Sequence, residues 1–190
     1  LTVNEAALDT NPLPDGADLA AGVVTGTQPG LTTETAASGA MNELTFTAGS
    51  DPITSVVFFN TAGITIDAGL EPGTVVTWTL SNGGRTLTGS IGGQDAIVLQ
   101  LSGSQSAAAG GDTVTPTVTV TLTDAFPHED NPDADQLVIS GVTVRASEAD
   151  ATDFADGTVT VTVLDDAPVA VDDVATTAED VAVRTTAAYE

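Results

Sequence analysis

Alternating apolar and hydroxyl-bearing residues run through much of the chain and predict β-strands. The clearest runs cover residues 117–123 and 158–163, where Val or Leu on one face alternates with Thr on the other. A period of two is typical of an antiparallel strand with one buried and one solvated face. Helix signals are almost absent, so the pattern predicts an all-β protein. Shorter strands are expected at 43–47, 53–59, 74–80, 85–91, 96–101 and 137–145, with one more inside 23–27.

Turn residues separate these runs. Asn82-Gly83-Gly84 predicts a tight hairpin between 74–80 and 85–91. Within 137–145 the apolar residues change face across Ser140-Gly141, which predicts a β-bulge that resets the register. Many short strands joined by turns are typical of a sandwich. We therefore expect an elaborated antiparallel, Ig-like or cadherin-like β-sandwich of about nine or ten strands.

The aromatic residues and one polar segment refine this expectation. Trp78, Phe46, Phe58 and Phe59 lie inside strand patterns, so we expect them in the core rather than on a binding platform. Residues 102–112 are small and polar, which is typical of a flexible loop or an insertion point.

The charge balance excludes several functions. The 190 residues include 27 acidic residues, three Arg and no Lys, for a net charge of −24. Nucleic acids and anionic membrane surfaces attract clustered Lys and Arg, so neither is an expected partner. Disulfides and zinc–thiolate sites are excluded because the chain has no Cys. No apolar run approaches the roughly 18 residues of a membrane span, and residues 1–9 do not have the pattern of a signal peptide.

Acidic residues gather in tight groups, mostly in the second half of the chain. Carboxylates this close together either stay solvated or share a cation, and Ca²⁺ takes six to eight oxygen ligands. The alternative to cation binding is a soluble, halophile-type acidic surface. The groups are Glu129, Asp130, Asp133 and Asp135; Glu148, Asp150, Asp153 and Asp156; Asp165 and Asp166; and Asp172 and Asp173.

Three segments carry a resemblance to a known family. The closing run GTVTVTVLDDAP at 157–168 resembles the end of repeats in giant RTX adhesins, which are bacterial surface proteins exported by type I secretion. The opening VNEAAL at 3–8 and the middle TVTLTD at 119–124 are similar to the same type I secretion target repeat. Family members carry Asp-Ala-Asp-Gly-Asp shortly before the closing strand, where this chain has EADATD at 148–153. The resemblance covers about residues 1–168.

The resemblance implies bound calcium. The turn DDAP at 165–168 also resembles the linker of cadherins, in which carboxylates of one module and a Glu of the next share Ca²⁺. By that analogy Asp165 and Asp166 pair with Glu179, while Glu5 pairs with a preceding module across a junction, with the first and last strands running to opposite poles. Pro168 would stiffen the junction. The implied ligands are Glu5, Glu148, Asp150, Asp153, Asp165, Asp166 and Glu179.

A further acidic turn leaves two interpretations open. Asp130, Asp133 and Asp135 form either a second calcium loop or a solvated turn. The spacing does not fit an EF-hand, which needs acids at positions 1, 3 and 5 and Gly at position 6. Neighbouring His128 is expected to be an exposed turn residue rather than a catalytic one.

A weak echo between residues 1–8 and 175–181 suggests the domain boundary. We interpret 1–167 as one calcium-binding module and 168–190 as a linker with the first strand of the following module, within a tandem array. The resemblance then implies a secreted protein on a Gram-negative cell surface, anchored to the outer membrane. Its partners would be adjacent modules of the same chain and, through neighbouring domains, a host-surface or biofilm ligand.

Three classes of function follow. The first is a non-catalytic structural and adhesive module stabilised by calcium. The second is a carbohydrate- or ice-binding module, because the Thr ladder at 115–123 resembles the flat Thr arrays of ice-binding proteins. Such ladders are ordinarily the solvent-facing side of a strand. Only the Thr residues of 158–162 are expected to extend this ladder into a wider array. The third is a glycosidase with paired carboxylates, yet nothing in the sequence places two acids across a cleft. The expectation is a protein that is not an enzyme.

Overall fold

The structure is a computed structural model that describes residues 1–5, 24–25, 44–67, 69–129, 136–149 and 152–165. This described part holds no helix long and apolar enough to cross a membrane. Its strands are β1 Thr2–Asn4, β2 Val24–Thr25, β3 Phe46–Thr47, β4 Ile53–Phe58, β5 Thr65–Ile66, β6 Val76–Ser81, β7 Thr86–Ile91, β8 Gln94–Ser102, β9 Thr113–Val114, β10 Thr117–Leu122, β11 Gln136–Glu148 and β12 Phe154–Leu164.

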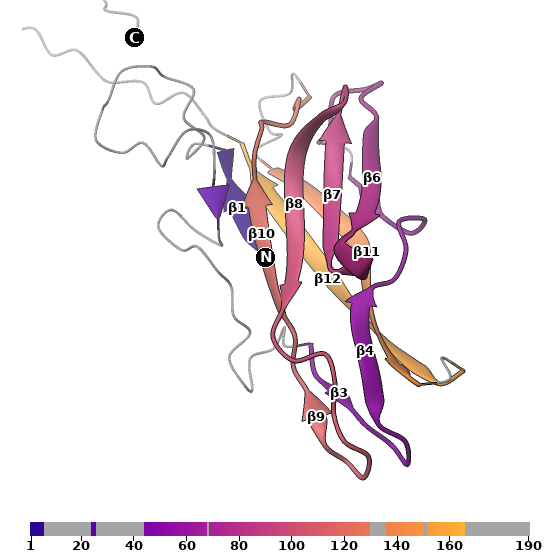
Figure 1. Cartoon of the computed structure of the whole chain (residues 1–190). Coiled ribbons are helices and arrows are strands. Elements are labelled where there is room, and N and C mark those ends of the chain that lie inside the picture. Colours follow the sequence, from indigo (N-terminus) through magenta and orange to yellow (C-terminus); the bar gives the residue numbers. More distant parts are fainter. Residues whose placement is uncertain (6–23, 26–43, 68, 130–135, 150–151, 166–190) are drawn as a thin grey trace, which may run out of the picture.

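Two sheets pack face to face, which confirms the expected all-β sandwich (Figure 1). One sheet has the strand order β1-β12-β11-β4, with β5 paired to β11. The other has the order β2-β10-β8-β7-β6, and β3 and β9 form a separate two-stranded ribbon. Among the described strands every pair is antiparallel except β1 and β12, which run parallel.

The core follows from the alternation in the sequence. Successive residues of a strand point to opposite faces, so the Val residues of β10 and β12 and Leu122 of β10 are buried while the Thr residues between them reach solvent. Phe46 and Phe58 are buried as expected, and Trp78 packs against the core from a half-buried position. The expectation for Phe59 is wrong, because this side chain is 43% exposed. Phe58 already points inward, so its neighbour points outward.

The two predicted turn features are both confirmed. Asn82–Gly84 forms a short 3-10 turn between β6 and β7, with φ of 50° at Asn82 and 65° at Gly83. In β11 the register shifts between Ile139 and Val142. Gly141 has a φ of 79° there, and a Cβ on it would overlap the carbonyl group of Gly63. Both conditions favour Gly at the bulge.

The polar segment 102–112, expected to be a flexible loop or an insertion point, is held against the sandwich by backbone hydrogen bonds. Its backbone is tied to residues 48–53: the amide of Ala107 donates to the Ile53 carbonyl at 3.1 Å, and that of Gly110 donates to the Gly49 carbonyl at 2.7 Å. Ala107 is also buried. Long-range backbone hydrogen bonds therefore fold this segment over the start of β4.

Pairing of the first and last described strands positions the site. Thr2 lies opposite Thr162 and Asn4 opposite Leu164 in a parallel register. The nitrogen of Leu1 donates to the Thr160 carbonyl at 2.8 Å, and the Thr162 amide donates to the Leu1 carbonyl at 2.7 Å, so Leu1 continues this pairing. The expectation that the first and last strands run to opposite poles is wrong. Both strands end at one pole, and the residues that follow them, Glu5 and Asp165, come together there.

Candidate functional site

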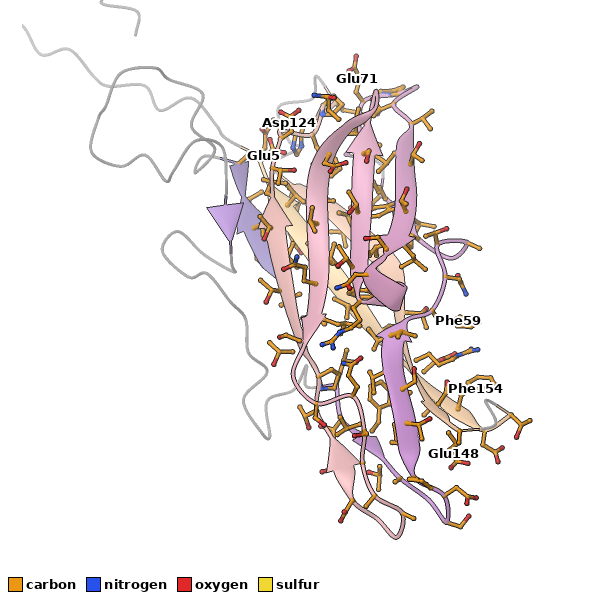
Figure 2. The ribbon with its side chains drawn as sticks, in the orientation of Figure 1. Glu5, Phe59, Glu71, Asp124, Glu148 and Phe154 are labelled. Carbon is orange, nitrogen blue, oxygen red and sulfur yellow. The ribbon has the colours of Figure 1, made fainter. Side chains whose placement is uncertain are left out.

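Glu5, His128 and Asp165 form the candidate site at the pole where β1 and β12 end; Figure 2 shows Glu5 at this upper end of the sandwich. Nε2 of His128 lies 3.2 Å from Oε1 of Glu5 and 3.9 Å from Oδ1 of Asp165. One ligand-type atom from each residue lies within 4.8 Å of the other two. The three side chains come from both sheets, because His128 follows β10 of the second sheet.

A long-range backbone contact places His128. The amide of Glu71 donates to the Pro127 carbonyl at 2.8 Å, and the amide of Glu129 donates to the Gly69 carbonyl at 2.9 Å. His128 itself forms an isolated antiparallel bridge with Leu70. The expectation of an exposed turn residue is therefore wrong, since only 8% of the His128 side chain reaches solvent.

Glu5 is a buried carboxylate with polar support. Its side chain is 2% exposed, and the backbone amide of buried Phe126 donates to Oε1 at 2.8 Å. Burial raises the pKa of Glu5 above its ordinary value, while the Phe126 amide and the neighbouring His128 act in the opposite direction. Glu5 is the one buried charged residue in the described part of the chain. Its negative charge needs a compensating group at this pole, a need that the rest of the described core lacks.

The imidazole of His128 is buried, and its close polar contacts in the described part of the chain are with two carboxylates. Neither Nδ1 nor Nε2 has an aligned partner among the described residues, although Nε2 is close to the Glu5 carboxylate. Most buried side-chain polar atoms have at least one partner, so such an orphaned ring calls for a physical explanation. A nitrogen lone pair beside two carboxylates is also a common metal-binding arrangement.

Of the other expected calcium ligands, the two that the structure describes do not join this cluster. Glu148 is the last residue of β11 and Asp153 lies just before β12, and the Glu148 amide donates to the Asp153 carbonyl at 3.2 Å. Figure 2 shows Glu148 at the end of the sandwich opposite Glu5. The expected pairing of Glu5 with a preceding module is wrong, because its carboxylate is enclosed within its own domain. The remaining expected ligands lie outside the described residues, as does segment 168–190: Asp130, Asp133, Asp135, Asp150, Asp166 and Glu179.

Sequence reasoning missed an aromatic and cationic cluster on the outer face of the first sheet. The guanidinium carbon of Arg145 lies 3.3 Å from the ring centre of Phe59 and 3.6 Å from that of Phe154. Nε and Nη2 of Arg145 each donate to one Asp156 oxygen at 2.7 Å. This fork geometry lowers the pKa of Asp156 and raises that of Arg145. The cluster joins the outer faces of β4, β11 and β12.

A hydroxyl-rich face covers the outside of the second sheet. Thr88 of β7 lies opposite Thr79 of β6 and opposite Val98 of β8, which in turn lies opposite Thr121 of β10. The expectation that the Thr residues of 158–162 join the β10 ladder is wrong, because β12 belongs to the other sheet. The Thr residues that share the β10 face are Thr77, Thr79, Thr86 and Thr88.

Comparisons with known proteins identify no relative. No family model matches this sequence, and neither the curated proteins nor the solved structures gave a match. The likeness to RTX adhesin repeats therefore rests on the sequence motifs alone.

Proposed function

We propose that this chain is a non-catalytic, calcium-stabilised structural module of a secreted, surface-anchored bacterial RTX adhesin. In such a protein it extends or supports the ligand-binding regions used in cell adhesion and biofilm formation. The observation that carries the proposal is the parallel pairing of β1 with β12.

Parallel first and last strands suit an end-to-end array. When the strand that opens a domain and the strand that closes it point the same way, the chain advances along the long axis of the sandwich. β12 runs from the pole of Glu148 to the pole of Glu5, and β1 runs towards the Glu5 pole beside it (Figure 2). Successive modules with this path would stack in a line, as an extender requires.

The module is proposed to be non-catalytic because its main polar cluster, formed by Glu5, His128 and Asp165, is mostly buried. The side chains of Glu5 and His128 are 2% and 8% exposed, and only that of Asp165, at 33%, is substantially exposed to solvent. Catalytic and ligand-binding groups ordinarily line an open concave pocket. The cluster is better suited to holding strands together.

Calcium is proposed for the acidic turns. Glu148 at the end of β11 and Asp153 before β12 are joined by a backbone hydrogen bond, and hard oxygen ligands such as their carboxylates are what Ca²⁺ takes. A net charge of −24 disfavours the compact state through self-repulsion. Bound divalent cations would relieve that repulsion and stabilise the fold.

Small-angle X-ray scattering on two copies of the chain joined in tandem tests this proposal. We expect about 10 mM Ca²⁺, above the Kd of roughly 10⁻⁴–10⁻³ M typical of extracellular calcium modules, to narrow the distribution of end-to-end distances relative to EDTA. A protein that is equally extended and equally rigid in EDTA would contradict the proposal. A compact, folded-back pair in Ca²⁺ would contradict the linear array.

The hydroxyl-rich face supports a second candidate function, binding to ice or a carbohydrate. The Thr side chains of β10, β7 and β6 recur at about 6.7 Å along each strand and about 4.8 Å between neighbouring strands. Val98 and Gln100 of β8 interrupt this array between β10 and β7, and sheet twist of roughly 20–25° per strand bends it. The array is therefore less regular than a flat ice-binding plane.

Thermal hysteresis of ice growth tests the second candidate. If the face binds ice, the wild-type chain will depress ice growth, Thr88→Tyr on this face will lose most of the effect, and Thr160→Tyr on the opposite sheet will keep it. Absence of hysteresis in the wild-type chain, or equal activity in the two variants, would remove ice as the ligand.

A further inference from the structure

We propose that Glu5, His128 and Asp165 form a site for a divalent transition-metal ion, of which Zn²⁺ is the representative, rather than for calcium. This inference deepens the proposed function, since both hold that a divalent cation stabilises the module. It concerns a different ion and a residue, His128, that the adhesin resemblance does not include.

The geometry of the three ligand atoms favours a single small ion. Zn²⁺ binds His nitrogen and carboxylate oxygen at roughly 2.0–2.2 Å, so neighbouring ligands of one ion lie roughly 3–4 Å apart. The distances from His128 Nε2 to the two carboxylates, 3.2 Å and 3.9 Å, lie in this range. All three ligand atoms fall within 4.8 Å of one another, so small side-chain movements would bring them to one centre.

The orphaned imidazole supplies an independent observation. The side chain of His128 is more than nine-tenths buried, and neither of its nitrogens has an aligned hydrogen-bond partner within the described ranges. Nε2 nevertheless faces two carboxylates. A metal ion among these groups would use the nitrogen lone pair and would also compensate the buried charge of Glu5.

Calcium fits this cluster poorly. Ca²⁺ takes six to eight oxygen ligands, whereas this cluster offers two carboxylates and the nitrogen of His128. Imidazole is a preferred ligand of Zn²⁺ and other late first-row ions, and carboxylates complete such sites. One imidazole nitrogen and two carboxylates therefore favour Zn²⁺, a borderline-soft ion, over Ca²⁺, a hard one.

A metal ion here would cross-link the two sheets. Glu5 and Asp165 follow paired strands of the first sheet, and His128 follows β10 of the second. Binding at this pole would connect the beginning, middle and end of the domain, and a ligand that binds only the folded state stabilises it.

Isothermal titration calorimetry of the EDTA-stripped full chain with Zn²⁺ tests the inference, together with thermal unfolding in Zn²⁺, Ca²⁺ and EDTA. We expect one strong Zn²⁺ site per chain and a higher melting temperature with Zn²⁺. His128→Leu and Asp165→Asn should each bind Zn²⁺ at least tenfold more weakly. The matched control is Asp124→Asn, which removes one exposed charge at the same pole outside the cluster (Figure 2) and should leave Zn²⁺ affinity unchanged.

Measuring each variant against its own melting temperature in EDTA keeps the test independent of folding defects. His128→Leu removes two buried nitrogens that lack an aligned partner, but it also removes the group that lowers the pKa of Glu5, so the Zn²⁺-induced shift within each variant is the quantity compared. Equal Zn²⁺ affinity in wild type and His128→Leu, or no Zn²⁺ binding at all, would overturn the inference. Stabilisation by Ca²⁺ that persists in His128→Leu, without a Zn²⁺ response, would overturn the inference yet leave the proposed function standing. No stabilisation by either ion would defeat both.

Discussion

The bulge in β11 offers a quantitative test of the fold through substitution of Gly141 by Ala. Two separate effects should destabilise this variant. Gly141 has a φ of 79°, and a left-handed conformation costs a non-Gly residue about 1–2 kcal/mol. The added Cβ would also lie 2.8 Å from the Gly63 carbonyl carbon and closer still to its oxygen, and such overpacking costs about 1–3 kcal/mol.

One opposing effect reduces the total. Replacing Gly by Ala lowers the entropy of the unfolded chain and so stabilises the native state by about 0.4–1 kcal/mol. The expected net loss for Gly141→Ala is therefore about 1–5 kcal/mol, with a midpoint of about 3, a large share of the 5–15 kcal/mol typical of a domain. For a chain of this size a loss of about 3 kcal/mol would lower the melting temperature by roughly 6–12 °C.

Two further glycines separate the contributions. Gly92 has a φ of 59° but no atom within 4 Å of an added Cβ, so Gly92→Ala measures the backbone conformation alone and should lose about 1 kcal/mol. Gly49 has neither a positive φ nor a close neighbour, so Gly49→Ala should be neutral or slightly stabilising.

Urea unfolding followed by fluorescence of Trp78 provides the assay. This is the one Trp of the chain, and it packs against the core from β6. We expect the midpoints to fall in the order Gly49→Ala, Gly92→Ala, Gly141→Ala, with unchanged slopes. If Gly141→Ala is no less stable than Gly92→Ala, the close approach of Gly141 to Gly63 is absent and the reasoning about the bulge is refuted.

Three further outcomes follow from particular contacts. Arg145 lowers the pKa of Asp156. The stability that this pair adds is therefore present above the ordinary Asp pKa of 3.8 and is lost as pH falls through the lowered pKa. The difference in unfolding free energy between wild type and Asp156→Asn should be constant near neutrality and shrink below about pH 4. Leu99→Ala, at a fully buried position of the central strand β8, should lose about 2–5 kcal/mol in urea unfolding, and a loss below about 1 kcal/mol would place Leu99 outside the core. Ala107→Glu would bury a charge and should destabilise by more than about 2 kcal/mol, while Ala108→Glu on the exposed neighbour should change stability by less than about 0.5 kcal/mol; equal effects would contradict the docking of segment 102–112.

Strand positions were predictable because their signal is local. The alternation of Val with Thr in β10 and β12, the hairpin at Asn82–Gly84 and the change of face at Gly141 can each be recognised within a few neighbouring residues. The two-residue strands β5 and β9 could not be predicted, because two residues do not establish a period. Phe59 shows a related limit: a run of apolar residues does not reveal at which residue the strand ends.

The candidate site was only partly predictable. Glu5 and Asp165 were expected to bind a cation, but the direction of β1 relative to β12 decides that they meet, and strand direction depends on partners far apart in the chain. His128 is buried because residues 126–129 pair with residues 69–71, a contact with no local signal. The local feature that comes closest to indicating this burial is Phe126, an apolar aromatic residue in a polar stretch. Phe126 packs into the core, and His128 lies only two residues after it.

Calorimetric unfolding of the full chain in EDTA and in about 10 mM Ca²⁺ tests the central claim, a calcium-stabilised structural module, most directly. A site with a Kd near 10⁻⁴ M is then at roughly 100 times Kd, which stabilises the folded state by about 2.7 kcal/mol. At 2–4 °C per kcal/mol for a chain of this size, the melting temperature should rise by roughly 5–10 °C. The same melting temperature in EDTA and in Ca²⁺ would contradict the account.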